Sequence, residues 1–183
     1  MKKVLLLLTV MLVSFVSSAQ ITYDGDIKVW KGTAVYDVAF DYSALKINNQ
    51  PSDEFLQAQD EDFRNDWKNV IVPGSEAMGM LVPSQVNDKF TWGTNPQYKF
   101  VIKVTNITLG NAGQMFNPFS SVKAGGAVIS GDIDIIDVAS GEIVAVLHID
   151  HLQGYPAYSD KDRWIMAYAE LAKRTKKILK KAK

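Results

Sequence analysis

The feature that most constrains this chain is a predicted β-hairpin, with strands Gly126–Val138 and Glu142–His151. In the first strand, Ile133 and Ile135 alternate with aspartates, which is the period-two pattern of a strand with one buried face. The second strand begins with an apolar run rich in β-branched residues, typical of a strand that is central in its sheet or covered on both faces. The two segments therefore predict an antiparallel pair at the centre of the fold.

A three-residue loop, 139–141, sets the register of this hairpin. Gly141 suits the left-handed position that closes such a loop, where a Cβ would be strained. The residue numbers of facing partners then sum to about 280 throughout, so that apolar residues face apolar residues. The expected pairs are Val138–Glu142, Ile135–Ala145, Ile133–Leu147 and Asp132–His148.

The N-terminal segment Met1–Ala19 has the layout of a secretory signal peptide. Two lysines precede the apolar run Val4–Val16, and small residues then form a cleavage site that would leave Gln20 at the mature N-terminus. The apolar run is shorter than the roughly 20 residues that span a bilayer. The other interpretation is a buried N-terminal helix or strand. Because the chain has no cysteine, it forms no disulfide and carries no lipid on an N-terminal cysteine, so we expect a periplasmic or secreted bacterial protein.

Residues 20–183 are long enough, and apolar enough, for one domain with a substantial core. Their charge is unevenly distributed. The segment Gln20–Ala172 holds 11 basic and 20 acidic residues, a net charge of −9, whereas the segment after it holds seven basic residues and no acidic one. We therefore expect an acidic body with a basic C-terminal helix.

The other elements follow from hydrophobic spacing and from turn residues. They are a strand Ile27–Tyr42 with an irregularity at Gly32, a helix Asp53–Asn69 capped by Ser52 and ended by Pro73-Gly74, a strand Tyr98–Leu109, and a helix from Asp160 onward. Residues 75–89 fit two short helices or a helix followed by a loop. The order β-α-(α)-β-β-β-α predicts an α+β fold, a two-layer sandwich with a mixed sheet of about four strands packed on helices.

Three short motifs resemble a pattern in exported bacterial proteins. They are a glycine-rich run, Lys123–Ala127, a strand ending in aspartate, Gly131–Asp137, and the turn and strand Ser140–Ala145. The chain resembles an uncharacterised, Bacteroidetes-type exported family whose domain is similar to the soluble α/β domain of curli-secretion-type lipoproteins. The resemblance implies a fold and no catalytic residues. This chain departs from the curli-secretion proteins because it lacks the lipid-bearing cysteine and recognisable pore-forming hairpins, which argues against a channel.

The best candidate for metal or acid–base chemistry is a cluster of His148, Asp150 and Asp132. His148 and Asp150 project from the same face of a strand, and Asp132 faces His148 across the hairpin. Such a cluster could serve a metal-dependent hydrolase. The more economical interpretation is a cross-strand ion pair, because the sequence contains no helical pair of metal-binding histidines and no nucleophile motif. The residues require no cofactor.

The candidate binding residues lie in loops. The long connection Gly110–Gly125 carries Met115, Phe116 and Phe119, which could cap the core or present an apolar surface to a partner. Trp92 lies in a turn-rich stretch and is a candidate for an exposed binding residue.

These observations favour a non-enzymatic, exported domain that acts in binding or envelope assembly. The expected partner is a protein or another component of the cell envelope, or a second copy of the chain, engaged through the long loop and the sheet edge by strand addition or oligomerisation. An acidic exported body argues against nucleic acid. The basic tail is either a solvated helix end or a peripheral contact with an anionic membrane, through Lys176, Lys177, Lys180 and Lys181.

Overall fold

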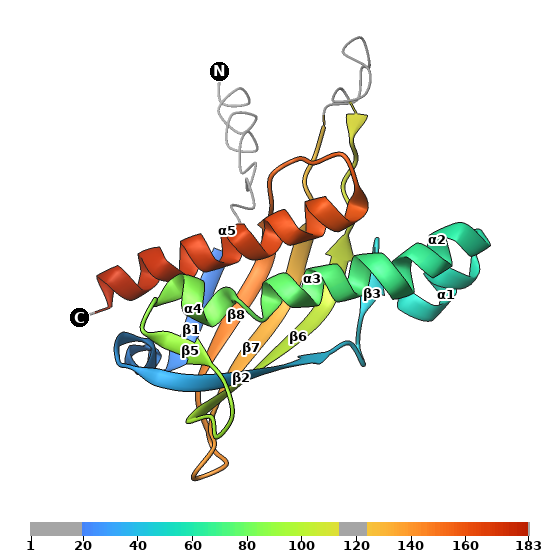
Figure 1. Ribbon diagram of the computed structural model, residues 1–183. Helices are drawn as coiled ribbons and strands as arrows, with labels where there is room; N and C mark the ends of the chain where they lie inside the picture. The colour runs from blue at the N-terminus through green and yellow to red at the C-terminus, as the bar shows by residue number, and fades with distance from the viewer. Residues whose placement is uncertain (1–19, 114–123, 183) are drawn as a thin grey trace, which may run out of the picture.

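A computed structural model describes residues 20–113 and 124–182 as one sheet with helices packed on one of its faces (Figure 1). The strands are β1 Gln20–Gly25, β2 Ala34–Asp41, β3 Lys46–Ile47, β4 Gln50–Pro51, β5 Phe90–Trp92, β6 Tyr98–Thr108, β7 Val128–Asp137 and β8 Ile143–Gln153. The main order is β1-β8-β7-β6-β2-β5, and β3 joins β6 and β4 at the side. Strand β2 runs parallel to β5 and β6, and the pairs among β6, β7, β8 and β1 are antiparallel.

The α+β class is confirmed, but the expected sheet of about four strands was too small. Eight strands form the sheet within the part of the chain that the structure describes. Three of the additional strands, β3, β4 and β5, have only two or three residues, too few to show a period-two pattern. The expected strand Ile27–Tyr42 was wrong in its first half. Ile27–Lys31 is a 3₁₀ helix that buries Ile27 and Trp30, and β2 begins only at Ala34.

The register predicted for the central hairpin is confirmed over its middle. Asp132 faces His148, Ile133 faces Leu147 and Ile135 faces Ala145. Strand β8 lies between β1 and β7, so its predicted central position is also confirmed.

The expected pairing of Val138 with Glu142 was wrong. A register shift follows Ile135, and the Asp137 N–H donates to the Glu142 carbonyl at 2.9 Å. The Val138 N–H instead donates to Gln97 at the start of β6, at 2.9 Å. Contact with the segment that leads into β6 therefore changes the pairing at the base of the 139–141 loop.

The helix predicted over Asp53–Asn69 is divided. The structure forms α1 Ser52–Gln57, α2 Glu61–Asp66, a π-helical turn Trp67–Ile71, α3 Val72–Gly79 and α4 Val82–Val86. Asp60 separates the first two helices because its carboxylate accepts the Phe63 N–H at 2.7 Å, as an N-cap does. Pro73 does not end the helical run as expected. It lies in the first turn of α3, a position that tolerates the missing N–H.

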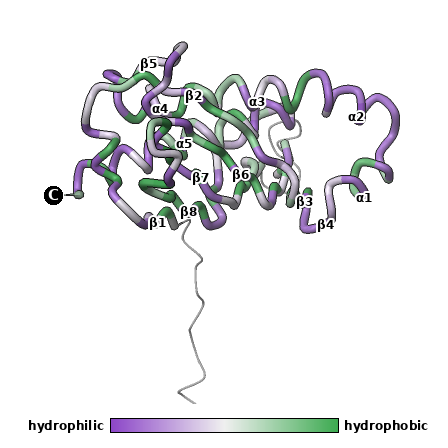
Figure 2. The backbone as a smooth tube through the Cα atoms, turned by 90° about the horizontal axis from the view of Figure 1, so that it is seen from below, coloured by the Kyte–Doolittle hydropathy of each residue, from purple (hydrophilic) through white to green (hydrophobic). Residues whose placement is uncertain are grey.

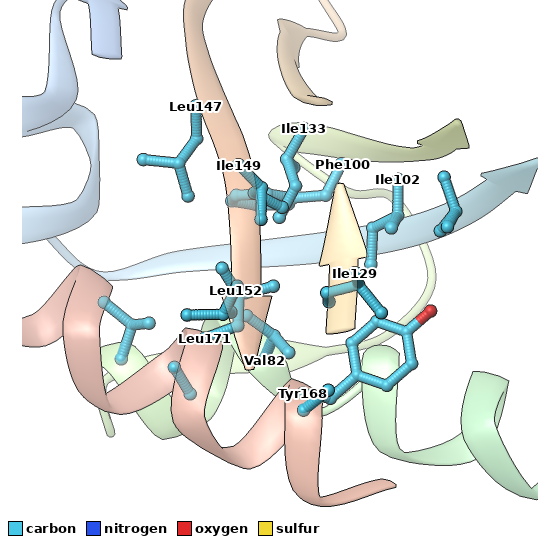
Figure 3. Packing of buried hydrophobic residues seen from close by; sticks show 14 of the residues in the cluster. Val82, Phe100, Ile102, Ile129, Ile133, Leu147, Ile149, Leu152, Tyr168 and Leu171 are labelled. Atoms are coloured by element: carbon cyan, nitrogen blue, oxygen red, sulfur yellow. The ribbon is translucent and has the colours of Figure 1, made fainter. Parts of the chain in front are cut away.

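The C-terminal helix is confirmed as α5, Asp160–Lys181, capped by Ser159, whose hydroxyl accepts the Asp162 N–H at 3.0 Å. Tyr168 and Leu171 on this helix pack against buried side chains of the sheet and of α4 (Figure 3). Helices α1 and α2, by contrast, bury no residue and extend beyond the sheet at the right of Figure 1. Figure 2 shows α2 as mostly hydrophilic. Among the described residues, no helix is both long and apolar enough to cross a bilayer.

Candidate functional site

The face of the sheet opposite the helices carries a row of charged side chains. Alternation along β8 buries Leu147 and Ile149 under the helices and turns His148 to the other face. Asp132 on β7 faces His148 directly, and Lys103 on β6 faces Asp132 in turn. Histidine, carboxylate and ammonium groups from three neighbouring strands therefore lie side by side.

His148 lies between two carboxylates. Its Nδ1 is 2.7 Å from Asp132 Oδ1 and its Nε2 is 3.1 Å from Asp24 Oδ2. Hydrogen bonds to Asp132 first, and then to Asp24, raise the pKa of His148 above its ordinary value of about 6.5. Both ring nitrogens donate in the imidazolium form, so the arrangement favours a protonated histidine over a neutral ligand to a metal.

The expected cluster of His148, Asp150 and Asp132 is therefore only partly assembled. Asp150 forms a contact with the neighbouring His151 instead, at 2.5 Å between Oδ1 and Nδ1. Asp24 takes its place beside His148, because β1 pairs with β8. Within residues 20–113 and 124–182, no group of three or more histidine, cysteine or acidic side chains could hold a metal ion. The hydrolase hypothesis stays a prediction that metal analysis of the purified protein would test.

The second ion pair of this face joins β6 to β7. Lys103 Nζ is 2.5 Å from Asp134 Oδ2, and the Asp134 side chain is only 8% exposed. This hydrogen bond and the charge of Asp134 raise the pKa of Lys103. Asp132 and Asp134 thus form cross-strand ion pairs, which help to fix the register of the sheet.

Trp92 is exposed, as expected for a binding residue, with 61% of its surface accessible. It ends the short edge strand β5 and faces Tyr36 at the end of the sheet where β6 begins. The other expected binding residues, Met115, Phe116 and Phe119, lie outside the described residues. Their role stays a prediction.

The two ends of the long connection are nevertheless described. Asn111 and Gly125 exchange two backbone hydrogen bonds of 3.0 Å, just beyond the far end of β6. Trp92 faces Tyr36 on β2, which in turn faces Tyr98, the first residue of β6, so Trp92 lies level with the opposite end of β6 from Asn111. Trp92 and the base of the loop therefore do not form one binding site.

Sequence reasoning missed two features. The first is β1, which forms one edge of the sheet; the alternation of polar and apolar residues from Gln20 to Asp24 was the available signal. The second is Arg163, which is 6% exposed on α5 and whose guanidinium donates to three backbone carbonyls. The available signal for the second feature was the position of Arg163, four and eight residues before the apolar Ala167 and Leu171 of a predicted helix.

No family model matches the chain, and no curated protein matches it significantly. Among solved structures, it is similar to the PelC dodecamer from Paraburkholderia phytofirmans, with a TM-score of 0.43 and 11% identity over 85% of this chain and 96% of that chain. A variant of the same dodecamer gives a TM-score of 0.41 and 12% identity over the same shares. A likeness at this level carries no conclusion about function or assembly.

Proposed function

We propose that this chain is an exported, non-enzymatic domain that binds a protein partner by strand addition at β1. The observation that carries the proposal is the open edge of the sheet. Among the described strands, β1 pairs with β8 alone, so its other side has no partner strand. The expected cleavage after Ala19 supports the proposal, because it would make Gln20, the first residue of β1, the first residue of the mature chain.

The register defines which backbone groups lie on the open edge. The Asp26 N–H donates to the Val144 carbonyl at 2.9 Å, and the antiparallel pairing continues from there to Gln20. Backbone groups of an antiparallel strand point alternately toward and away from the partner strand. Those of Thr22 and Asp24 therefore face β8, and those of Ile21 and Tyr23 face outward.

Strand β1 has few of the features by which edge strands avoid pairing. Its sequence, QITYDG, contains no lysine and no proline, and its pairing with β8 has no bulge. Its one charged side chain, Asp24, is held toward His148 on the outer face of the sheet. The outward N–H and C=O groups of Ile21 and Tyr23 are therefore available to a strand from another chain.

A Tyr23→Pro variant tests this proposal. Proline removes one outward N–H and leaves the hydrogen bonds between β1 and β8 in place, so the fold should persist. Loss of one or two intermolecular backbone hydrogen bonds should weaken association by about tenfold. Sedimentation velocity would measure self-association, and capture from a cell-envelope fraction would measure binding to other proteins.

The matched control is Thr22→Val, which alters a side chain on the same strand and leaves the outward backbone groups unchanged. It should associate as the unaltered protein does. Equal association of the Tyr23→Pro variant and the unaltered protein, with unchanged melting temperatures, would rule out β1 as the binding edge.

A further inference from the structure

Four lysines from three separate segments meet at one pocket, at the end of the molecule where α5 finishes beside α4 (Figure 1). The pocket has a volume of about 410 Å³. Its charged lining consists of Lys31, Lys89, Lys176, Lys180 and Asp88. The lining therefore carries four positive charges and one negative charge.

The C-terminal end of α5 accounts for the position of three of these four lysines. Lys176 and Lys180 lie in the last turns of α5, where cations interact favourably with the C-terminal end of a helix. Lys31 ends the 3₁₀ helix, and its Nζ donates to the carbonyl of Ala182, the C-cap residue of α5. Lys89 precedes β5 and belongs to neither helix. The four like charges at this pocket repel one another, and Asp88 offsets only one of them.

Hydrogen bonds of Asn87 fix the backbone segments that carry Lys31 and Lys89. Asn87 Nδ2 donates to the carbonyls of Trp30 at 2.6 Å and of Gly32 at 2.9 Å. Asn87 Oδ1 accepts the Lys89 N–H at 3.1 Å. The Asn87 side chain thus joins the segment that carries Lys89 to the 3₁₀ helix that carries Lys31. These hydrogen bonds fix the backbone of the two segments relative to each other.

The lysines also determine the hydrogen-bonding character of the lining. A lysine ammonium group has three donors and no acceptor. The lining therefore offers mainly donors, which suits a ligand with several acceptor oxygens.

We propose that this pocket binds a phosphate-bearing group, with Lys31, Lys89, Lys176 and Lys180 as its ligands. A volume of about 410 Å³ can hold a phosphorylated small molecule or the head group of an anionic lipid. The inference is independent of the binding edge at β1. It also refines the expectation for the basic tail, because Lys176 and Lys180 line the pocket and Lys177 and Lys181 do not.

The test uses the purified protein and two probes. Calorimetric titration with pyrophosphate measures binding of a free anion. Co-sedimentation with vesicles containing phosphatidylglycerol, compared with vesicles of phosphatidylcholine alone, measures binding of a lipid head group. The site variant is Lys31→Gln/Lys89→Gln, which leaves α5 unchanged. The charge-matched control is Lys46→Gln/Lys99→Gln, two exposed lysines on β3 and β6 away from the pocket.

The site variant should bind at least one of the two probes about 30-fold more weakly than the unaltered protein, on the order of fivefold for each lysine removed. The control should change binding far less, and thermal melting should show that both variants are folded. Loss of pyrophosphate binding would identify a free phosphorylated ligand, and loss confined to phosphatidylglycerol vesicles would identify a lipid head group. Equal losses in the two variants, or no binding of either probe by the unaltered protein, would overturn the proposal.

Discussion

At the scale of single residues, Arg163 organises one end of the molecule. Its Nε donates to the Leu109 carbonyl at 2.8 Å, and its Nη1 donates to the carbonyls of Ala157 at 2.9 Å and Tyr158 at 3.0 Å. The Arg163 guanidinium also forms an ion pair with the Asp160 carboxylate. One buried cation thus joins the end of β6, the turn before α5 and the first turn of α5.

We predict that Arg163→Met lowers the free energy of unfolding by about 2–4 kcal/mol, because it leaves three carbonyls without their donor. Arg163→Lys should restore only part of the loss, since a single ammonium group cannot reproduce the geometry of a guanidinium. Urea denaturation measures both changes. Lys177→Met, an exposed position on the same helix, is the control. A loss no larger than that of the control would contradict this role.

His148 makes stability depend on pH. Its pKa is raised in the folded state by Asp132 and then Asp24, so its ion pairs stabilise the fold fully below the unfolded pKa of about 6.5. This contribution disappears as the pH rises through the folded pKa. The His148 and Asp132 side chains are 41% and 42% exposed, so the contribution should not exceed about 1 kcal/mol.

Asp132→Asn should therefore reduce stability more at about pH 5.5 than at about pH 8.5. Urea denaturation at the two pH values gives the difference, and NMR titration should show a lower pKa for His148 in the variant. Asp150→Asn is the control, because Asp150 contacts His151 and not His148. The same loss at both pH values would show that Asp132 acts without the charge of His148.

At the scale of elements, a bulge in the central strands depends on Gly131. The register shifts between Ile129 and Gly131 on β7, and between Val104 and Asn106 on β6. Gly131 has φ of +155°, and a Cβ at this position would lie 2.0 Å from the Lys103 carbonyl oxygen. Only a glycine allows β6 and β7 to pair at this point.

We predict that Gly131→Ala costs at least about 2 kcal/mol of unfolding free energy, from backbone strain and from the clash. Gly32→Ala is the matched control, since a Cβ there would contact nothing within 4 Å and its φ is −83°. Thermal or urea denaturation of the two variants measures the difference. Equal free energies of unfolding for the two variants would show that β6 and β7 can pair without a glycine at position 131.

At the scale of the whole molecule, the basic C-terminal segment lies against the acidic body. We expected the seven basic residues after Ala172 to form a helix end that is either solvated or in peripheral contact with an anionic membrane. Instead α5 packs along the domain as far as Leu179, which is 8% exposed. Lys176 and Lys180 therefore lie against the body, beside lysines from elsewhere in the chain.

The sequence alone determined the parts of the fold that depend on residues close to one another in the chain. The middle register of the hairpin followed from the alternation around Ile133, and α5 followed from helical spacing after Asp160. Strand β1 was missed although polar and apolar residues alternate from Gln20 to Asp24, and the 3₁₀ helix was missed because its five residues carry too little periodicity. Their structure depends on β8 and on the core.

Only the tertiary structure decided which distant residues meet. Asp24 reaches His148 because β1 pairs with β8, and Asp150, the expected partner, turns to His151. Lys31 and Lys89 reach the end of α5 because the helices pack on one face of the sheet. Local pattern predicts which face of an element a side chain lies on, but the order of strands and the packing of helices determine what that face contacts.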